Sequence, residues 1–140
     1  MSRKTLQHDW FERVWNQGDE NAIDELLTED VIGHGLVDAN GEEIRSRAAF
    51  KEFYLAFRGA FPDIQIAVLD VVCEGEFQVA RCHVRATHSG EGFVIAPTGR
   101  QVEFTGLCMV RIRDGKIAES WNEFDFLTLF QQLDAITFRS

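Results

Sequence analysis

The turn signal at Asp114-Gly115, with the alternating segment that follows it, constrains the fold of this chain more than any other feature. Aspartate and glycine tolerate the positive φ that a tight hairpin turn requires. A strand should therefore begin near Lys116. Alternation from Ile117 then puts Trp121 and, if the strand extends so far, Asp125 on one face.

Asp125 lies where this strand is expected to give way to a helix. The apolar residues after it recur at mixed three- and four-residue spacing, which is typical of an amphipathic helix: Phe126, Leu127, Leu129, Phe130 and Leu133. Two interpretations of Asp125 stay open. It is either the N-cap of this helix, whose side chain accepts a backbone N–H bond, or a carboxylate that points into a cavity.

The first half of the chain predicts three helices. The first covers residues 5–18 and ends at a glycine, and a short second one runs from residue 19 or 21 to about 27. Ser46 can cap the third, which ends before Pro62 because proline disfavours helical geometry in the preceding residue.

Aromatic residues recur at helical spacing in the first and third helices. The first carries Leu6, Trp10, Phe11, Val14 and Trp15, and the third carries Phe50, Phe53, Tyr54, Phe57 and Phe61. Such stripes usually form core against a sheet. Core packing is therefore the first interpretation of Trp15, Tyr54 and Phe57, and a place in the wall of a ligand cavity is the second.

Alternating, β-branched segments predict a short strand at residues 31–37 and long strands at 64–73, 77–87 and 101–113. In the short strand His34 lies between two glycines. Glycine in a strand often marks a bulge or a close approach by another group. The simplest role for His34 is a hydrogen-bonded residue of a cavity wall.

One face of the segment 77–87 is polar and the other is apolar. Continued alternation puts His88 on the apolar, inward face and His83 on the polar face, which faces solvent or another subunit. A metal site built from this pair is not expected, because the two rings point to opposite sides.

Composition limits the function classes. The chain has 140 residues, of which 45% are hydrophobic, and this suits one globular domain over residues 1–140. The formal net charge of −9 argues against nucleic acids and anionic membrane surfaces as partners, because both require a basic surface. A small or neutral partner is expected.

Cys73, Cys82 and Cys108 are odd in number and form no C-x-x-C pair, so neither a disulfide framework nor a cysteine zinc site is indicated. They are expected to be buried thiols of a reducing cytoplasm. The sequence also shows neither a signal peptide nor an apolar run of membrane-spanning length, and we expect a cytoplasmic, soluble protein.

Together these elements describe an α+β cone: a strongly bent antiparallel sheet packed against three N-terminal helices, with a short C-terminal helix. A bent sheet leaves a cavity between its concave face and the helices. An aromatic lining would suit a flat, hydrophobic ligand. The residues expected to face inward include His88, Trp121 and Asp125.

Several motifs resemble those of the SnoaL-like polyketide cyclases and their predicted ester cyclase relatives, within the nuclear-transport-factor-2-like superfamily of cone folds. The resemblance covers nearly the whole chain. It is carried by Phe61-Pro62-Asp63, Ala86-Thr87-His88-Ser89-Gly90, Ala96-Pro97-Thr98-Gly99, Arg111-Ile112-Arg113-Asp114-Gly115-Lys116-Ile117-Ala118-Glu119-Ser120-Trp121, Asp125 and Gln131-Gln132-Leu133. The chain departs from the family pattern at Ala86, at Phe93-Val94-Ile95-Ala96, near the expected mouth of the pocket, and at Asp134.

The resemblance implies a reaction and a site. Characterised members close the last ring of an aromatic polyketide by intramolecular aldol condensation, without metal or cofactor, with one aspartate as acid/base. That aspartate corresponds to Asp125. His88 and His34 correspond to residues that would hydrogen-bond substrate oxygens, and Trp121 and Tyr54 would form walls, joined by Trp15 and Phe57. A homodimer or higher homo-oligomer is implied as well.

Two other readings stay open. The same cone could serve another cofactor-free proton transfer or hydration, such as a ketosteroid-isomerase-like shift or an epoxide opening. It could also be a non-catalytic binding or assembly module, in which Asp125 would act only as a helix cap with a lowered pKa.

Overall fold

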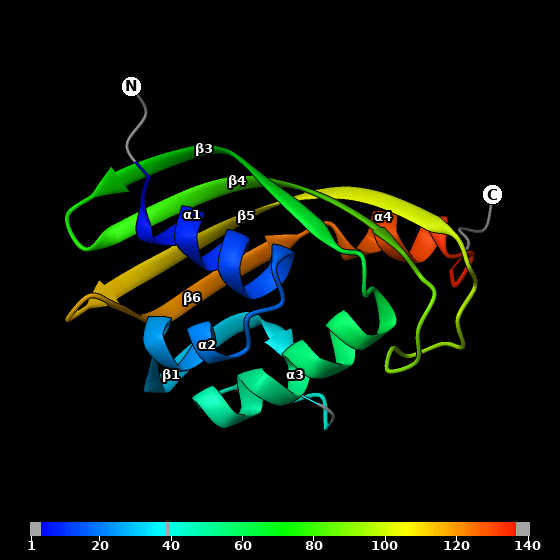
Figure 1. Ribbon diagram of the computed structural model, residues 1–140, viewed down its shortest axis with the longest axis horizontal. Coiled ribbons are helices and arrows are strands. Elements are labelled where there is room, and N and C mark those ends of the chain that lie inside the picture. The colour runs from blue at the N-terminus through cyan, green and yellow to red at the C-terminus, as the bar shows by residue number, and fades with distance from the viewer. Residues whose placement is uncertain (1–3, 39, 137–140) are drawn as a thin grey trace.

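The computed structural model describes residues 4–38 and 40–136. The helices are α1 (Leu6–Trp10), which continues into the π-helical segment η1 (Phe11–Asn16), α2 (Asn21–Leu26), α3 (Arg47–Ala60) and α4 (Phe126–Gln132). The strands are β1 (Leu27–Val37), β2 (Glu43–Ile44), β3 (Gln65–Glu74), β4 (Phe77–Thr87), β5 (Gln101–Arg113) and β6 (Lys116–Phe124). Figure 1 shows their arrangement.

The helix boundaries follow from local capping. The Thr5 side chain accepts the backbone N–H of His8, and the His8 side chain accepts that of Thr5, so the first helix begins with a reciprocal capping box. Ser46 caps α3 through the backbone N–H of Ala49, as predicted, and the helix ends before Pro62.

The six strands form one sheet in the order β2-β1-β6-β5-β4-β3. The hairpins predicted from the turn residues are present, and β3–β4, β4–β5 and β5–β6 are antiparallel. The β1–β6 pair is parallel, which differs from the fully antiparallel sheet that we expected. Long connections allow this pairing, because β1 and β6 lie near opposite ends of the chain and need no hairpin.

A β-bulge at the start of β6 reverses the expected alternation. Arg111 pairs with Glu119 and Ile112 with Ile117, so Ala118 is an extra residue on β6. An extra residue shifts every later side chain to the opposite face of a strand. The face of Trp121 predicted by counting from Ile117 is therefore wrong.

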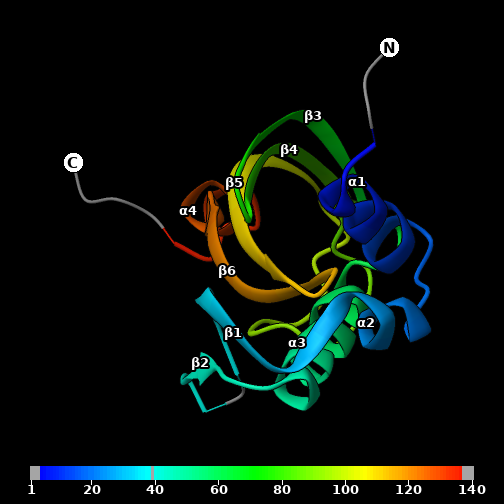
Figure 2. The ribbon, with the colours of Figure 1, turned by 90° about the vertical axis from the view of Figure 1, so that its left-hand side faces the viewer.

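The sheet is strongly curved, and the helices cover its concave side. Figure 2 shows it bending from β3 through β4, β5 and β6 to β1, with α1, α2 and α3 across the open side. The predicted α+β cone is thus confirmed, although the sheet does not close on itself. In the part of the chain that the structure describes, no helix is long and apolar enough to cross a membrane.

Candidate functional site

A small apolar cavity lies between the helices and the concave face of the sheet. Its volume is about 70 Å³. Aromatic rings form much of its wall, and they come from every helix except α2 and from two strands: Trp10, Phe11, Trp15, Phe50, Phe53, Phe57, Phe104, Phe124 and Phe126. Of the residues that the sequence suggested as ligand contacts, Trp15 and Phe57 line this cavity.

The polar side chains of the cavity wall are gathered on β5 and β6. Ser120, Asn122 and Cys108 lie there, and Cys108 is the direct strand partner of Asn122. Nδ2 of Asn122 donates to Oγ of Ser120 at 3.0 Å and to the backbone carbonyl of His34 at 2.9 Å. The Cys108 thiol donates to Oδ1 of Asn122 at 3.3 Å.

This network leaves one donor unused. Both amide hydrogens of Asn122 are bonded, and Ser120 Oγ already accepts one of them. A serine hydroxyl can also donate one hydrogen bond. Among the described residues none accepts the hydroxyl hydrogen of Ser120, so it can be donated to an oxygen of a ligand in the cavity.

Two glycines of β1 allow its backbone to approach the polar cluster of Cys108, Ser120 and Asn122. Gly35 has a φ of +82°, and a Cβ there would lie 2.0 Å from the backbone oxygen of Asn122. Gly33 lines the cavity, and a Cβ there would lie 3.6 Å from Ser120 Oγ. Of the two glycines beside His34, Gly35 thus marks a close approach, and the approaching group is β6, whereas a Cβ at Gly33 would make ordinary contacts.

Sequence reasoning missed Ser120 and Asn122 as functional candidates. Both were assigned to the face opposite Trp121, which was expected to face the cavity. The signal that could have found them is that two polar residues, Ser120 and Asn122, alternate on the same face of the strand as Phe124. The bulge at Ala118 has no distinctive residue type, so no residue pattern favours that face.

Tyr54 is buried but does not line the cavity. Its hydroxyl donates to the backbone carbonyl of Val14 at 2.9 Å, and its ring meets Trp15 edge to face with centroids 5.1 Å apart. Burial raises the pKa of its phenol. Tyr54 therefore joins α3 to η1 through this hydrogen bond and belongs to the core, as its first interpretation predicted.

His34 and Trp121 lie on the outer face of the sheet, away from the cavity. Their rings stack with centroids 5.3 Å apart at 23°. Nε2 of His34 lies 2.6 Å from a Glu119 carboxylate oxygen, and Nδ1 contacts the carboxylate of Glu43. These hydrogen bonds, first that to Glu119, raise the pKa of His34. We expected both rings in the cavity wall, and the reversed alternation of β6 explains why Trp121 is outside.

Asp125 is exposed and caps α4. Its carboxylate accepts the Thr128 hydroxyl at 2.6 Å and the Thr128 backbone N–H at 3.0 Å. These bonds lower the pKa of the carboxyl group, the opposite of what burial in an apolar pocket would do. Asp125 does not line the cavity, so of the two interpretations the structure supports the helix cap. Its catalytic role stays a prediction.

His88 faces inward, as the alternation of β4 predicted, and it is 0% exposed. Its Nδ1 accepts the backbone N–H of Thr98 at 3.3 Å and lies 3.1 Å from the Thr98 hydroxyl. Phe61 stacks on its ring with centroids 5.1 Å apart. The ring is not part of the cavity wall.

Cys82 and Cys108 are buried, as expected, but Cys73 is exposed on β3, so the expectation of a buried thiol is wrong there. Burial raises the pKa of the Cys82 thiol to about 12, and it also raises that of Cys108, while Cys73 is accessible to solvent. Within residues 4–38 and 40–136, no three His, Cys, Asp or Glu side chains are grouped so that they could hold a metal ion.

Comparisons with known proteins agree with the fold. The family model of the SnoaL-like polyketide cyclases matches residues 5–133. IdmH of Streptomyces antibioticus, described as a candidate polyketide cyclase, is 32% identical over 92% of this chain and 96% of its own, with a TM-score of 0.77. The comparison with curated sequences gave no match.

Two further solved structures are similar at lower identity. A candidate polyketide cyclase of Bacillus cereus is 26% identical, over 94% of this chain and 80% of its own, with a TM-score of 0.78. AclR of Streptomyces galilaeus, described as a candidate hydroxylase, is 27% identical over 91% of this chain and 81% of its own, with a TM-score of 0.75. The chain therefore belongs to the SnoaL-like polyketide cyclase family.

Proposed function

We propose that this protein binds a small, largely apolar carbonyl compound in the cavity and promotes its intramolecular ring closure, as a polyketide cyclase would. The observation that carries the proposal is an aromatic cavity in which the described polar side chains, Cys108, Ser120 and Asn122, form one cluster, and in which no described residue accepts the hydroxyl hydrogen of Ser120. The family and the named relatives support the reaction class.

In the proposed reaction a proton leaves a carbon that lies between two carbonyl groups. The resulting enolate carbon forms a bond to the carbon of a further carbonyl group in the same molecule. The oxygen of that group becomes an alkoxide and takes up a proton. No atom is gained or lost, so the cyclised product is an isomer of the substrate. Ser120 would donate its hydrogen bond to the oxygen on which negative charge develops, and one such donor contributes roughly 10²- to 10³-fold to a rate.

The remaining contribution would come from positioning. An apolar wall folds a flexible chain so that its reacting carbons meet, and it strengthens the hydrogen bond from Ser120 by excluding water. Asn122 would act as a positioning residue. Its side chain is held by the His34 carbonyl and the Cys108 thiol, and from there it donates to Ser120 Oγ and fixes the orientation of that hydroxyl. A carbon between two carbonyls exchanges its proton readily in solution, so in this proposal the compound enolises before it enters the cavity, and no base is required among the described residues of the wall.

The assignment of Asp125 as acid/base, with His88 as a hydrogen-bond donor, remains the competing proposal. It comes from the resemblance of their motifs to those of characterised cyclases. The position of Asp125 as the exposed cap of α4 does not favour it. Isomerase-like proton shifts and epoxide opening would also need a carboxylate in the cavity, and the described lining residues contain none.

Binding without catalysis is the second candidate function. The specific observation in its favour is that the described cavity wall contains neither a carboxylate nor an imidazole. Ligand binding in an apolar cavity needs only shape and one or two hydrogen bonds.

The test is a panel of linear aryl β-diketone esters, incubated with enzyme and followed by mass spectrometry and chromatography for cyclised isomers and their dehydration products. We expect Ser120→Ala to lower kcat by roughly 10² or more, and Asp125→Asn to keep turnover while lowering the thermal midpoint. The reverse pattern would restore Asp125 as the acid/base. Binding of the panel without turnover by the wild-type protein would select the binding function.

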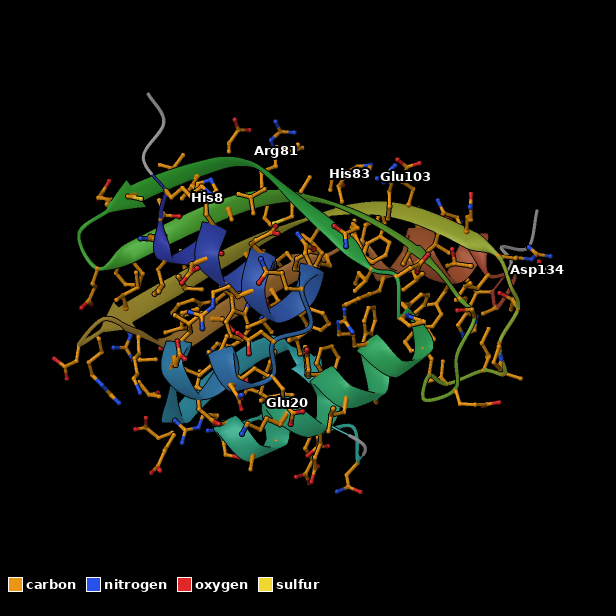
Figure 3. All side chains as sticks on the ribbon, in the orientation of Figure 1. His8, Glu20, Arg81, His83, Glu103 and Asp134 are labelled. Atoms are coloured by element: carbon orange, nitrogen blue, oxygen red, sulfur yellow. The ribbon has the colours of Figure 1, made fainter. Side chains whose placement is uncertain are left out.

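The predicted homodimer and the cytoplasmic location also remain proposals. The outer face of the sheet carries Arg81, His83 and Glu103, which point away from the helices (Figure 3). Arg81 pairs with Asp70 at 2.6 Å, and Nε2 of His83 lies 2.9 Å from a carboxylate oxygen of Glu103. Light scattering of the purified protein would give its oligomeric state.

A further inference from the structure

A polar groove crosses the outer face of the sheet, on the side away from the apolar cavity. It runs from Gln65 on β3 over Arg85 on β4 and Glu103 on β5 to Gln132 on α4, and its volume is about 560 Å³. Sites for small molecules typically measure roughly 300–1,000 Å³. The groove therefore has the size of a ligand site, and its lining is unlike that of the aromatic cavity.

The guanidinium of Arg85 has no partner in this groove. Among residues 4–38 and 40–136, every other arginine donates to a carboxylate or to a backbone carbonyl; Arg81, for example, pairs with Asp70 at 2.6 Å. The chain has 23 Asp and Glu residues against 14 Lys and Arg, so carboxylates are abundant. An arginine that none of the described carboxylates binds is therefore a specific feature of this groove.

The strand register explains why Arg85 is unpaired. Its direct neighbours across the sheet are Gln65, which has no charge, and Glu103. Nε2 of His83 lies 2.9 Å from a carboxylate oxygen of Glu103, and both of these side chains point away from the helices (Figure 3). Because His83 already engages the Glu103 carboxylate, the donors of Arg85 stay available to another acceptor.

The walls of the groove are fixed by hydrogen bonds to the backbone. The Gln132 side chain accepts the backbone N–H of Glu103 and donates to its carbonyl, both at 2.8 Å. Asp63 accepts the backbone N–H of Thr87 at 2.7 Å. Arg85 itself lies in the middle strand of three that are paired along this stretch. A site built on such a rigid base loses little freedom when a ligand binds.

Two carboxylates limit the kind of anion that this groove can accept. Asp63 and Glu103 line it together with Arg85. One negative charge is attracted by the guanidinium next to it, whereas a second charge on the same ligand would be repelled by the two carboxylates. Carboxylate oxygens also accept hydrogen bonds from a donor. The groove therefore favours a monoanion that carries a hydrogen-bond donor.

We propose that this groove binds a small polar monocarboxylate such as a hydroxy acid. The ligand carboxylate accepts two parallel hydrogen bonds from the planar guanidinium of Arg85, which matches the geometry of a carboxylate. The amides of Gln65 and Gln101, which border the groove, supply further donors, and the ligand hydroxyl donates to Glu103. The groove and the cavity lie on opposite faces of the sheet, so failure of either proposal leaves the other untouched.

The test is a titration of the nitrogen-15-labelled protein with lactate, followed through the Nε–H resonances of its arginines at low salt. Lactate is too polar for the aromatic cavity, and lactamide is its uncharged analogue. We expect lactate to shift the Arg85 resonance with a Kd of about 1–10 mM, as for one charge-assisted pair at an exposed site. Lactamide should cause no shift, and equal binding of the two compounds would refute recognition of a carboxylate.

Two variants on the same face of the sheet separate the site from general surface charge. Arg85→Gln should weaken lactate binding about tenfold, because the charge-assisted bonds are lost. Arg81→Gln removes the same charge from a guanidinium that is already paired, and it should bind lactate as the wild type does. If both variants lose affinity equally, or if no arginine resonance shifts up to about 50 mM lactate, the site does not exist.

The flanking carboxylates give an independent check. Inorganic phosphate at pH 8 is mainly a dianion, and it should bind more weakly than lactate because Asp63 and Glu103 repel its second charge. Tighter binding of phosphate would overturn the assignment to monocarboxylates. If the Arg85 resonance instead shifts when the protein alone is diluted, a second copy of the chain occupies the groove, and the proposed ligand is wrong.

Discussion

Replacing Gly35 with alanine should destabilise the protein and, through Asn122, loosen the polar group of the cavity. The φ of +82° costs an L-residue about 1–2 kcal/mol. The new Cβ would also lie 2.0 Å from the backbone oxygen of Asn122, a contact that neither backbone can relieve without separation of β1 from β6. Separation breaks the bond from Asn122 to the His34 carbonyl, worth about 0.5–1.5 kcal/mol.

These two terms together amount to about 1.5–3.5 kcal/mol before the cost of the clash, and a loss of about 3 kcal/mol lowers the thermal midpoint of a domain of this size by about 10 °C. Two control glycines separate the causes. Gly75→Ala, at a φ of +59° with open space around it, should cost only the strain, about 1–2 kcal/mol. Gly33→Ala, where the nearest atom is 3.4 Å away and the φ is ordinary, should cost less than about 1 kcal/mol.

Urea unfolding followed by tryptophan fluorescence measures these differences, provided that the slope m is the same in all variants. If Gly35→Ala loses no more stability than Gly75→Ala, the close approach of β1 to β6 is not as described, and the inferred positioning of Asn122 and Ser120 loses its basis.

Two further predictions concern titratable side chains. Because hydrogen bonds to Glu119 and Glu43 raise the pKa of His34, the stabilisation they give is complete below about pH 6.5 and is lost as the pH rises through the raised pKa. The thermal midpoint of the wild type should thus exceed that of His34→Gln most near pH 6, and a constant difference up to pH 9 would contradict this. Ellman's reagent should titrate one thiol, Cys73, in the native protein and all three cysteines in urea, because Cys82 and Cys108 are buried with raised pKa values; rapid reaction of more than one native thiol would show that the core opens.

Local signals in the sequence predicted most of the fold. The Asp-Gly turn set the β5–β6 hairpin, Ser46 set the start of α3, and alternation in β4 placed His88 on the buried face. The cap at Asp125 was one of two interpretations that its position between strand and helix allowed. Each of these features depends on residues close in sequence, and short-range rules are sufficient for them.

The composition of the cavity wall was only partly predictable. The aromatic stripes identified Trp15 and Phe57, because a helix with a fixed period must present one face to the sheet. Tyr54 belongs to the same stripe, but its hydroxyl finds an acceptor in Val14 and the residue becomes part of the core. Which members of a stripe border empty space depends on the packing of other elements.

The sequence by itself determined the α+β architecture, the hairpins, the helix starts and the burial of His88. The tertiary structure decided which face of β6 meets the cavity. The bulge at Ala118 and the parallel pairing of β1 with β6 are set by contacts between segments far apart in the chain, and a shift of one residue exchanges the two faces of a strand. For this reason Ser120 and Asn122, rather than Trp121, line the cavity.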